Sequence, residues 1–551
     1  MTEPRTGGQL VVDALRSHHV THTFGVPGES YLAVLDALVG SGIDYICFRH
    51  EGGAAYAAEA WGRFTGQPGV CMVTRGPGAT NASVGIHAAH QNSMPLVVLI
   101  GQVATYEQGR EAFQEIDYRA FLGPISKWAT QVDHVDDLAG TLVDGFRIAT
   151  SGRPGPVVIA LPEDVLRATT EVVDVTPSPE EWATPTSDDI DLILTELEAA
   201  TAPVVVVGGG RWTEQARQDL AVFAEANDLP VVTAFRFHDL MDNHSPCFVG
   251  EAGVGMPQPV RETITGADLI FGLGIRFGEM TTAAWTLIDP SNPRPRIIHV
   301  HPDRTQLGRI YPANVAVCGD PSVTIAALRD RRIPANAERS TWRQQRRQAL
   351  DDGLFAPAQP GSLDMGQVMS WLQANLPPDV VLTNGAGNLS IWPNKLFRYG
   401  PKARLLAPQN GTMGYGLPAA IAAKLAAPER TVVCFAGDGD FQMTLQELGA
   451  ARQIGAEPIV LVLDNGMYGT IRAHQEREYP GRISGTPITN PDFVAVARAY
   501  GFHAEKITET ESFPDAFSRA VASPTGAVLH LMVPPEMLTP WQAIEPAVAE
   551  D

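Results

Sequence analysis

Two polar residues in the last third of the sequence stand at the ends of apolar runs. Asp438 follows the run 431–436, and Asn465 follows the run 459–463. The β-branched residues of both runs predict buried strands, and the apolar spacing of 442–454 predicts a helix between them. Asp438 and Asn465 would then lie past the carboxyl ends of two strands in one βαβ unit, where parallel sheets bind ligands. Their oxygens suit a hard cation such as Mg²⁺, which proteins usually hold together with phosphate groups.

The spacing of these residues resembles the cofactor motif of the thiamine diphosphate-dependent decarboxylases and carboligases. The resemblance rests on the Gly-Asp-Gly motif centred on Asp438 and on the later pair Asp464-Asn465, although that family usually ends the motif in Asn-Asn. It implies that thiamine diphosphate binds here with Mg²⁺, whose protein ligands are Asp438, Asn465 and the carbonyl of Met467. Other implied contacts to the cofactor are Gly437, Gly439, Asp440, Tyr468 and Gly469.

A second candidate is Glu51, which follows a strand predicted at 45–49 and opens a helix rich in small residues. A glutamate at the start of a helix often only interacts favourably with the helix dipole. The surrounding sequence RHEGGAAYAAEAWGR, however, resembles the catalytic glutamate segment of the same family. The resemblance implies that Glu51 hydrogen-bonds the pyrimidine ring of the cofactor and favours the imino tautomer, whose nitrogen removes the thiazolium proton.

Two glycine-containing segments follow predicted strands in the same part of the chain. The segment 411–416 resembles the GxMG segment of the family, which implies that Met413 holds the cofactor in a bent shape and that the Gly411 carbonyl bonds its amino group. A core methionine beside a glycine-rich turn is the alternative. Asn388 ends the segment 383–388, whose backbone amides could face anionic oxygens of the diphosphate. A purely structural turn is the alternative there.

Three further residues resemble positions of the acetolactate synthase large subunit within this family. The resemblance implies that Gln114 lies beside the reacting substrate as a catalytic residue and that Lys127 lines the substrate entry. It also implies that Arg276 reaches the mouth of the site, where its guanidinium can bind a carboxylate through two parallel hydrogen bonds. A surface lysine is the alternative interpretation of Lys127.

The sequence departs from the acetolactate synthases where they contact the acceptor substrate and the flavin. Gly278-Glu279 stand where that family carries two aspartates, and His474 stands where it carries the tryptophan that selects the acceptor. The segment 249–255 replaces one that lines the flavin site. We therefore expect FAD to be absent and leave the acceptor open.

Two histidines, His87 and His90, lie three residues apart on a predicted helix and therefore on one face of it. Histidines titrate near neutral pH, so this pair could line the pocket as acid–base groups. Histidines that belong to the core or to an interface are the alternative interpretation.

The elements that must position these residues alternate between strands and helices, which predicts parallel α/β domains. At about 150 residues per domain, a chain of 551 residues corresponds to three or four of them. We predict three doubly wound parallel-sheet domains at 1–171, 189–332 and 362–540, with a proline-containing linker at 172–188 and a charged, partly helical connector at 335–360. The first and third are alike in strand spacing. The resemblance implies that the three are the pyrimidine-binding, central and diphosphate-binding domains.

The net charge, the apolar runs and the cysteines make some classes of protein and of binding partner less favourable. The net charge of −22 disfavours nucleic acid and anionic membranes as partners. No apolar run reaches the roughly 18 residues of a membrane helix, and the first residues lack the features of a signal peptide. Five widely spaced cysteines without a CxxC pair, of which Cys47, Cys71 and Cys434 lie in apolar runs, predict buried thiols and no structural zinc. We therefore expect a cytoplasmic protein.

Together these features predict a thiamine diphosphate- and Mg²⁺-dependent, acetolactate synthase-like carboligase that acts on a 2-oxo acid or related ketone. Alternatives in the same superfamily are a non-ligating decarboxylase, an aldehyde lyase and a diketone hydrolase. A nicotinamide or flavin oxidoreductase is disfavoured because Gly208-Gly209-Gly210 lacks the GxGxxG pattern. A non-catalytic binding protein is disfavoured because Glu51 and Asp438 are both present. The resemblance implies a homodimer or homotetramer in which Glu51 and the metal site facing one cofactor come from different chains.

Overall fold

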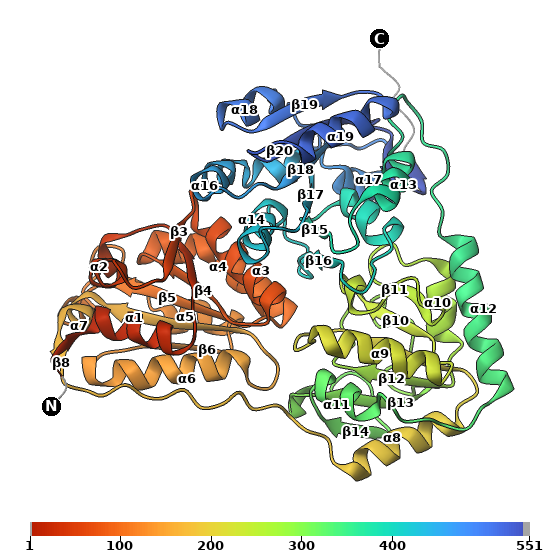
Figure 1. Ribbon diagram of the computed structural model, residues 1–551, viewed down its shortest axis with the longest axis horizontal. Coiled ribbons are helices and arrows are strands. Elements are labelled where there is room, and N and C mark those ends of the chain that lie inside the picture. Colours follow the sequence, from red (N-terminus) through yellow and green to blue (C-terminus); the bar gives the residue numbers. More distant parts are fainter. Residues whose placement is uncertain (1–2, 544–551) are drawn as a thin grey trace. The chain divides into compact units, whose positions relative to one another are not determined.

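The computed structural model describes residues 3–543 and contains three six-stranded sheets with helices packed on them (Figure 1). Every neighbouring pair of strands within these three sheets is parallel. This confirms the predicted class of three doubly wound α/β domains. The contacts divide the chain into two compact units, of which the first contains the residues up to Glu181 together with 408–429 and 442–458. The domain boundaries given above stay a prediction.

The first sheet belongs to the N-terminal part of the chain. In spatial order its strands are β3 (Asp44–Cys47), β2 (His22–Gly25), β4 (Gly69–Val73), β5 (Leu96–Gln102), β7 (Pro156–Pro162) and β6 (Trp128–Gln131). Every residue of β4, β5 and β7 is buried. These strands are nearly continuous apolar runs because a parallel sheet covered by helices on both faces has no solvated face.

The helices of this first sheet include a closely packed pair, α3 and α4. The helices are α1 (Gly7–Ser17), α2 (Leu32–Leu38), α3 (Glu51–Thr65), α4 (Gly76–Asn92), α5 (Tyr118–Leu122), α6 (Leu138–Thr150) and α7 (Glu163–Arg167). A Cβ atom added to Gly85 on α4 would lie 2.4 Å from the Cβ of Ala55 on α3. The small residues of α3 and α4 therefore permit a close approach of two helix backbones, which larger side chains would prevent.

The second sheet belongs to the central part of the chain. In spatial order its strands are β11 (Phe248–Ala252), β10 (Val231–Ala234), β9 (Pro203–Val207), β12 (Leu269–Leu273), β13 (Arg296–His301) and β14 (Val315–Cys318). Counted along the chain this is the order 3-2-1-4-5-6, which is typical of dinucleotide-binding folds. Its helices are α8 (Ser187–Ala199), α9 (Glu214–Ala226), α10 (Gln258–Thr265) and α11 (Pro321–Leu328).

The third sheet belongs to the C-terminal part of the chain. In spatial order its strands are β16 (Arg404–Leu406), β15 (Val381–Asn384), β17 (Val432–Gly437), β18 (Ile459–Asp464), β20 (Ala527–Met532) and β19 (His503–Ile507). The other elements of this region are α13 (Met365–Asn375), η7 (Asn388–Ser390), η8 (Trp392–Leu396), α14 (Gly416–Ala426), α17 (Gly469–Glu478), α18 (Phe493–Ala499) and α19 (Phe513–Val521). Counted along the chain within each sheet, the first and third sheets share the order 2-1-3-4-6-5, so the two are alike in topology.

The prediction of one continuous helix at 442–454 is wrong. The structure has α15 (Asp438–Gln442), η9 (Leu445–Glu447) and α16 (Leu448–Ile454) in its place. The break lies at Thr444, whose φ of −140° is not helical and whose hydroxyl donates a hydrogen bond to the Gly414 carbonyl at 2.8 Å. A side-chain hydrogen bond to a remote backbone group competes here with the helix, which apolar spacing alone cannot reveal.

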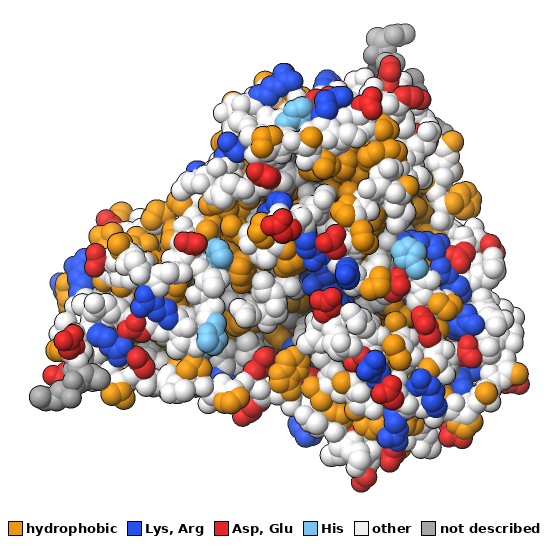
Figure 2. Space-filling view, in the orientation of Figure 1, with side chains coloured by type: hydrophobic (Ala, Val, Ile, Leu, Met, Phe, Trp, Pro, Cys, Tyr) orange, Lys and Arg blue, Asp and Glu red, His pale blue; other side chains and the backbone are white. Residues whose placement is uncertain are grey.

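The segments between the sheets follow the expectations more closely. Within the described chain, residues 171–186 contain no helix or strand, and the charged connector forms α12 (Ala337–Gly353). Cys71 and Cys434 are buried free thiols as expected, whereas Cys47 is only half-buried. Within residues 3–543, no helix combines the length and apolar character needed to cross a membrane. Basic and acidic side chains are interspersed on the face that Figure 2 shows.

Candidate active site

Asp438 is a buried carboxylate surrounded by hydrogen-bond donors. It begins α15 at the carboxyl end of β17, and it is 3% exposed. Its carboxylate accepts hydrogen bonds from the backbone amides of Gly439 (2.9 Å) and Gly466 (3.0 Å) and from the side chain of Asn490 (2.7 Å). Burial raises the pKa of Asp438, and the carboxylate of Asp464 acts in the same direction. A cation bound at this carboxylate would oppose both effects, which is the behaviour of a metal ligand.

The neighbouring Asp464 is the residue at which this chain departs from the Asn-Asn pair, and its surroundings suit a carboxylate. It ends β18, and one of its carboxylate oxygens lies 2.8 Å from Nε2 of His530 on β20. The other oxygen accepts from Asn490 at 2.7 Å and from the Gly466 amide at 3.0 Å. Burial acts to raise the pKa of Asp464, but the hydrogen bonds from His530, Gly466 and Asn490, together with the charge of His530, outweigh burial and lower the pKa overall. The carboxylate is thus held charged, and the amide nitrogen of Asn490 bridges it to Asp438.

Asn490 and His530 are not predicted as site residues by the sequence. Both lie in segments far along the chain from the motif around Asp438, and neither belongs to a pattern of its own. The one available signal was the aspartate at 464, because a buried carboxylate in place of an amide requires an additional donor nearby.

Asn465 and Met467 lie in the loop between β18 and α17. The loop lies beside Asp438, because β17 and β18 are adjacent strands and the Gly466 amide donates to the Asp438 carboxylate. The Asn465 side-chain oxygen accepts from the Met467 amide at 3.3 Å, and Met467 forms an antiparallel bridge with Pro487. Within residues 3–543, no three His, Cys, Asp or Glu side chains form a metal-binding cluster. A bound Mg²⁺ would therefore need the amide and carbonyl oxygens of this loop in addition to Asp438, a ligand set that suits Mg²⁺ held with phosphate groups.

A buried donor beside the same strand ends fits an anionic group. The Asn388 amide donates to the Thr470 hydroxyl at 3.0 Å, and that hydroxyl donates to the Asn388 side-chain oxygen at 2.9 Å. The Asn388 side-chain nitrogen is buried and has no hydrogen-bond partner among residues 3–543. An oxygen of a bound diphosphate would satisfy this donor, whose isolation is otherwise unfavourable.

The glycines of the motif are required by close contacts. A Cβ atom at Gly437 would lie 2.6 Å from the Leu389 side chain, and one at Gly439 would lie 2.5 Å from the ring of Tyr468. Tyr468 is partly exposed and directly precedes Gly469, the first residue of α17. Asp440 is buried and accepts from the Ala386 amide at 3.3 Å, so it fixes the turn after β15.

Glu51 is the first residue of α3 and is half-buried. The preceding residue, His50, caps the helix by accepting a hydrogen bond from the Gly52 amide at 3.0 Å. One Glu51 carboxylate oxygen accepts from the side chain of Asn81 on α4 at 2.9 Å. The carboxylate is thus oriented by a single neutral donor and keeps further lone pairs for a ligand.

The start of α3 is also held by the buried Glu447 of η9. Its carboxylate accepts from the Arg49 amide at 2.9 Å, and a Cβ atom at Gly53 would lie 2.7 Å from it. Burial raises the pKa of Glu447 to about 7, against the hydrogen bond from Arg49. A titratable group therefore supports the turn that presents Glu51.

The segment 408–415 lies against α3 and carries Gly411 and Met413. Gly411 has a φ of +68°, the left-handed region that favours glycine. The hydroxyl of Tyr56 on α3 contacts the Thr412 hydroxyl and donates to the Met413 carbonyl at 3.3 Å. One helix therefore carries Glu51 at its start and fixes this segment one turn later.

Gln114 occupies a strained position beside the first turn of α4. Its φ is +66°, and its carbonyl accepts from the Gly76 amide at 3.0 Å. Its side-chain oxygen accepts from Arg75 at 3.3 Å, and Arg75 is itself paired with Glu163 at 2.7 Å. A non-glycine residue held with positive φ by its neighbours is more frequent at functional sites than elsewhere.

Three other predicted residues of the first unit lie in different surroundings. Lys127 precedes β6, at the amino edge of the sheet, whereas Glu51 follows the carboxyl end of β3; the structure does not bring the two together. The Lys127 ammonium donates to the carbonyls of Ile148 and Ser151 at the end of α6. His90 lies at the end of α4, where its carbonyl accepts from Arg153.

His87, by contrast, faces the segment 408–415. Its Nδ1 lies 3.2 Å from the side-chain nitrogen of Asn410. In the second unit, His474 is exposed on α17 with its Nδ1 2.6 Å from Arg477, and Arg276 follows the carboxyl end of β12 half-buried. His474 is therefore accessible to a ligand near the loop that carries Asn465.

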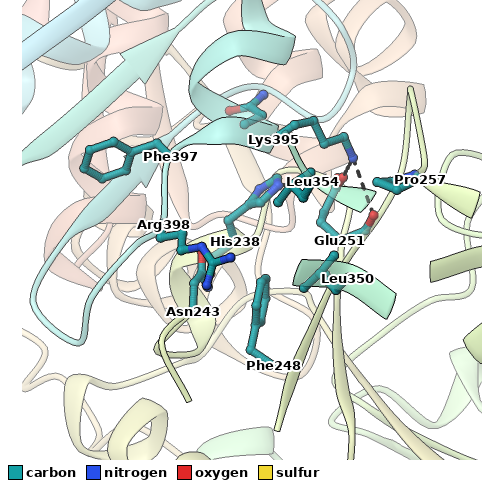
Figure 3. Close-up of a pocket in the computed structure, with 12 residues that line it drawn as sticks. His238, Asn243, Phe248, Glu251, Pro257, Leu350, Leu354, Lys395, Phe397 and Arg398 are labelled. Atoms are coloured by element: carbon teal, nitrogen blue, oxygen red, sulfur yellow. Dashed lines mark hydrogen bonds and ion pairs between the residues drawn. The ribbon is translucent and has the colours of Figure 1, made fainter. Parts of the chain in front are cut away.

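The segment 249–255 borders a small cavity of about 20 Å³ (Figure 3). Glu251 and Lys395 are buried and form an ion pair in it, and Nε2 of His238 lies 3.7 Å from the Glu251 carboxylate. Burial lowers the pKa of His238 to about 4, which keeps the ring neutral. The cavity is large enough for about one water molecule. The absence of FAD stays a prediction.

The chain matches three family descriptions along its length. These are "Thiamine pyrophosphate enzyme, N-terminal TPP binding domain" over residues 5–121, the central domain of the same enzymes over 190–328, and their C-terminal TPP binding domain over 385–531. The three matches fall on the three sheets in order, and the first and last contain Glu51 and Asp438.

Similar proteins of known name extend over nearly the whole chain. The acetolactate synthase large subunit of Parasynechococcus marenigrum (strain WH8102) is 34% identical, over 96% of this chain and 87% of that protein. The isozyme 2 large subunit of Escherichia coli (strain K12) is 31% identical over 98% of both chains, and its isozyme 3 large subunit is 34% identical over 94% and 92%. The chain therefore belongs to the thiamine pyrophosphate enzymes, in the family of the acetolactate synthase large subunits.

Proposed function

We propose that this protein is a thiamine diphosphate- and Mg²⁺-dependent carboligase of the acetolactate synthase type. It cleaves the C–C bond next to the carbonyl group of a 2-oxo acid or related ketone and joins the retained fragment to an acceptor. The observation that supports this most directly is the buried Asp438 beside Asn465, at the carboxyl ends of two adjacent central strands. Similarity to acetolactate synthases over nearly the whole chain supports the same class of reaction.

The anionic end of the cofactor is assigned to the third sheet. Asp438, Asn465 and the Met467 carbonyl bind Mg²⁺, and the unpartnered Asn388 nitrogen donates to a diphosphate oxygen. When bound, thiamine diphosphate supplies the nucleophilic carbon and the electron sink of the reaction. The remaining contacts on this side are Gly437, Gly439, Asp440, Tyr468 and Gly469.

The pyrimidine end is assigned to α3 and the segment 408–415. Glu51, oriented by Asn81, hydrogen-bonds the pyrimidine ring and exchanges a proton with it. The Gly411 carbonyl accepts from the amino group, and Met413 packs against the cofactor. Substrate contacts are proposed for Gln114, Arg276, His474, His87 and His90. Lys127 is left out because its ammonium donates to carbonyls at the end of α6.

We further propose that the active unit is at least a homodimer and that Glu51 and Asp438 of different chains face one cofactor. A cytoplasmic location is part of the same proposal. Light scattering on the active enzyme tests the assembly, and full activity in a monomer would contradict it. Flavin is not part of the proposal, and the purified protein should lack absorbance near about 450 nm.

Reconstitution of metal-free, cofactor-free protein tests the cofactor assignment. Activity should return only when thiamine diphosphate and Mg²⁺ are both added. Activity that persists after complete removal of either would refute the assignment. Binding of thiamine diphosphate without Mg²⁺ is measured in parallel, so that loss of binding is separated from loss of turnover.

A panel of donors tests the reaction itself. Pyruvate, longer and aromatic 2-oxo acids, diketones and acyloins are each supplied with and without an aldehyde or 2-oxo acid acceptor, and both CO₂ and the C–C product are followed. The proposal predicts that a ligation product accompanies CO₂. Release of CO₂ without any ligation product would replace the carboligase by a decarboxylase, and cleavage of a diketone without CO₂ would replace it by a hydrolase.

A further inference from the structure

We propose that Glu59 is a positioning residue that fixes the segment 408–415 through Asn92 and Tyr415. The inference rests on the proposed function in one respect, namely that this segment carries the cofactor contacts Gly411 and Met413. The geometric part, that a buried carboxylate holds the segment in place, stands on contacts within the first unit alone.

The carboxylate of Glu59 is fully buried between two donors. Glu59 lies on α3 and is 0% exposed. One of its oxygens accepts a hydrogen bond from the side-chain nitrogen of Asn92, the last residue of α4, at 2.7 Å. The other accepts from the hydroxyl of Tyr415, which directly precedes α14. Both carboxylate oxygens act as acceptors, so both neighbours turn a donor toward Glu59.

This requirement determines which way the Asn92 side chain points. Because its nitrogen faces Glu59, its oxygen faces the other way and accepts a hydrogen bond from the Gln409 backbone amide at 2.7 Å. Glu59 therefore acts on the segment at both ends, through Asn92 at Gln409 and directly at Tyr415. Asn92 is also fully buried, so water cannot replace either contact without opening the structure.

Two further contacts from the same helices hold the middle of the segment. Tyr56, three residues before Glu59 on α3, bonds the Met413 carbonyl, and His87 on α4 lies against Asn410. Since α3 also begins with Glu51, one rigid helix positions the proposed catalytic glutamate and the backbone that carries Gly411 and Met413. Misplacement of such a group by about 1 Å can reduce a rate about 10²-fold.

Stability alone gives no reason for a carboxylate at this place. A buried charge is unfavourable, and a well-packed apolar side chain of similar volume is often at least as stable. Burial raises the pKa of Glu59, and the charge of Arg63, one turn later on α3, opposes this. What the carboxylate provides, and an apolar group cannot, is two acceptors in fixed directions.

Amide hydrogen exchange on the cofactor-free protein tests the geometric part. Glu59→Leu removes both acceptors, Asn92→Ala removes the link to Gln409 while leaving Glu59, and Glu59→Gln keeps an acceptor for Asn92. Leu142→Ala is the matched control, because Leu142 is buried in the core around β5 and β7 and the variant lowers stability without altering these contacts. Exchange should accelerate by roughly tenfold or more at Gln409 and through 408–415 in the first two variants, and stay near wild type in Glu59→Gln and Leu142→Ala.

The catalytic part is tested by measuring two quantities separately, namely the affinity for thiamine diphosphate and the rate of thiazolium proton exchange. Glu59→Leu and Asn92→Ala should bind thiamine diphosphate within about threefold of wild type but exchange the thiazolium proton about 10-fold to 100-fold more slowly. Glu59→Gln should restore most of the rate. If Glu59→Leu does not fold, Asn92→Ala alone decides. Unchanged hydrogen exchange in 408–415, or an unchanged rate of proton exchange, would overturn the inference. Failure of the proposed function would instead appear in wild-type protein, as no response to thiamine diphosphate and Mg²⁺.

Discussion

The first and third sheets of this protein have the same strand order but opposite charges at the same topological position. In both, the third strand along the chain occupies the third place in the sheet, and a helix begins within three residues of its end. Arg75 directly precedes the helix that follows β4, and it is buried and paired with Glu29 and Glu163. Asp438 is the first residue of the helix that follows β17, and it is buried among the amides of Gly439, Gly466 and Asn490.

The difference shows that two sheets with the same strand order can place side chains of opposite charge at the same position. The carboxyl ends of parallel strands converge on one edge, so side chains that follow them meet there whatever their type. Arg75 has acidic partners that neutralise it, and its surroundings are complete. Asp438 accepts hydrogen bonds from neutral donors and has a second carboxylate beside it, so its surroundings favour a bound cation. The first sheet instead presents its candidate acid, Glu51, at an edge strand, where it is half-buried and has room for a ligand.

The largest expected effect is at Asp438. Asp438→Asn keeps the shape of the side chain but removes the charge that would hold Mg²⁺, which is worth several kcal/mol, so activity should fall by about 10³-fold or more. The measurement is the steady-state rate with a 2-oxo acid at saturating thiamine diphosphate and increasing Mg²⁺. Activity within about tenfold of wild type would show that Arg75 and Asp438 differ in charge for structural reasons only.

Glu51→Gln should cost less than the loss of Asp438. General acid–base groups typically contribute 10²- to 10⁴-fold, so we expect a fall of about 10²-fold in turnover, with thiamine diphosphate still bound. Exchange of the thiazolium proton, followed by NMR after acid quench, measures the step directly. Asn81→Ala, which removes the donor that orients Glu51, should give a smaller fall in the same assay. A wild-type exchange rate in Glu51→Gln would show that the edge strand does not present the catalytic acid.

Asn490→Ala isolates the bridge between the two carboxylates of the third sheet. Outer residues that orient metal ligands typically change metal affinity 10- to 100-fold, and we expect a loss of Mg²⁺ affinity in that range. Arg75→Met is the matched control from the first sheet. It breaks a buried ion pair and lowers stability, but it should leave Mg²⁺ affinity unchanged. Equal losses of affinity in both variants would mean that the effect reports general stability rather than the metal site.

The smallest expected effect is the dependence of stability on pH through Glu447. Its pKa is about 7 in the folded protein against an ordinary value of 4.5, so the folded state binds this proton more tightly than the unfolded state. Its contribution is therefore most favourable below about pH 4.5 and is lost as the pH rises to about 7, at a cost on the order of 2–3 kcal/mol. Urea unfolding between pH 5 and pH 8 should show this decline in wild type and a smaller one in Glu447→Gln. The same decline in both proteins would contradict the assignment.

Strand and helix alternation, the Gly-Asp-Gly motif and the small residues of α3 were readable in the sequence because each reflects a local requirement. A strand covered on both faces must be apolar, and a backbone that approaches its neighbour closely must lack side chains. The break at Thr444 was not readable, because it depends on a hydrogen bond to Gly414 that forms only when distant segments meet. Lys127 was placed near the substrate by resemblance alone, and its position before β6 could be judged only from the folded sheet.

The sequence by itself determined the three α/β domains, because strand patterns are properties of neighbouring residues. Its resemblance to the thiamine diphosphate enzymes implied the cofactor class and the candidate residues Glu51, Asp438 and Asn465. Only the tertiary structure decided what surrounds them. It placed Asn490 and His530 on the two carboxylates of the third sheet, Glu59 and Asn92 behind the segment 408–415, and the Glu251–Lys395 pair in the cavity beside 249–255. Such partners are set by which chain segments pack together, and that packing depends on the whole chain rather than on any one stretch of it.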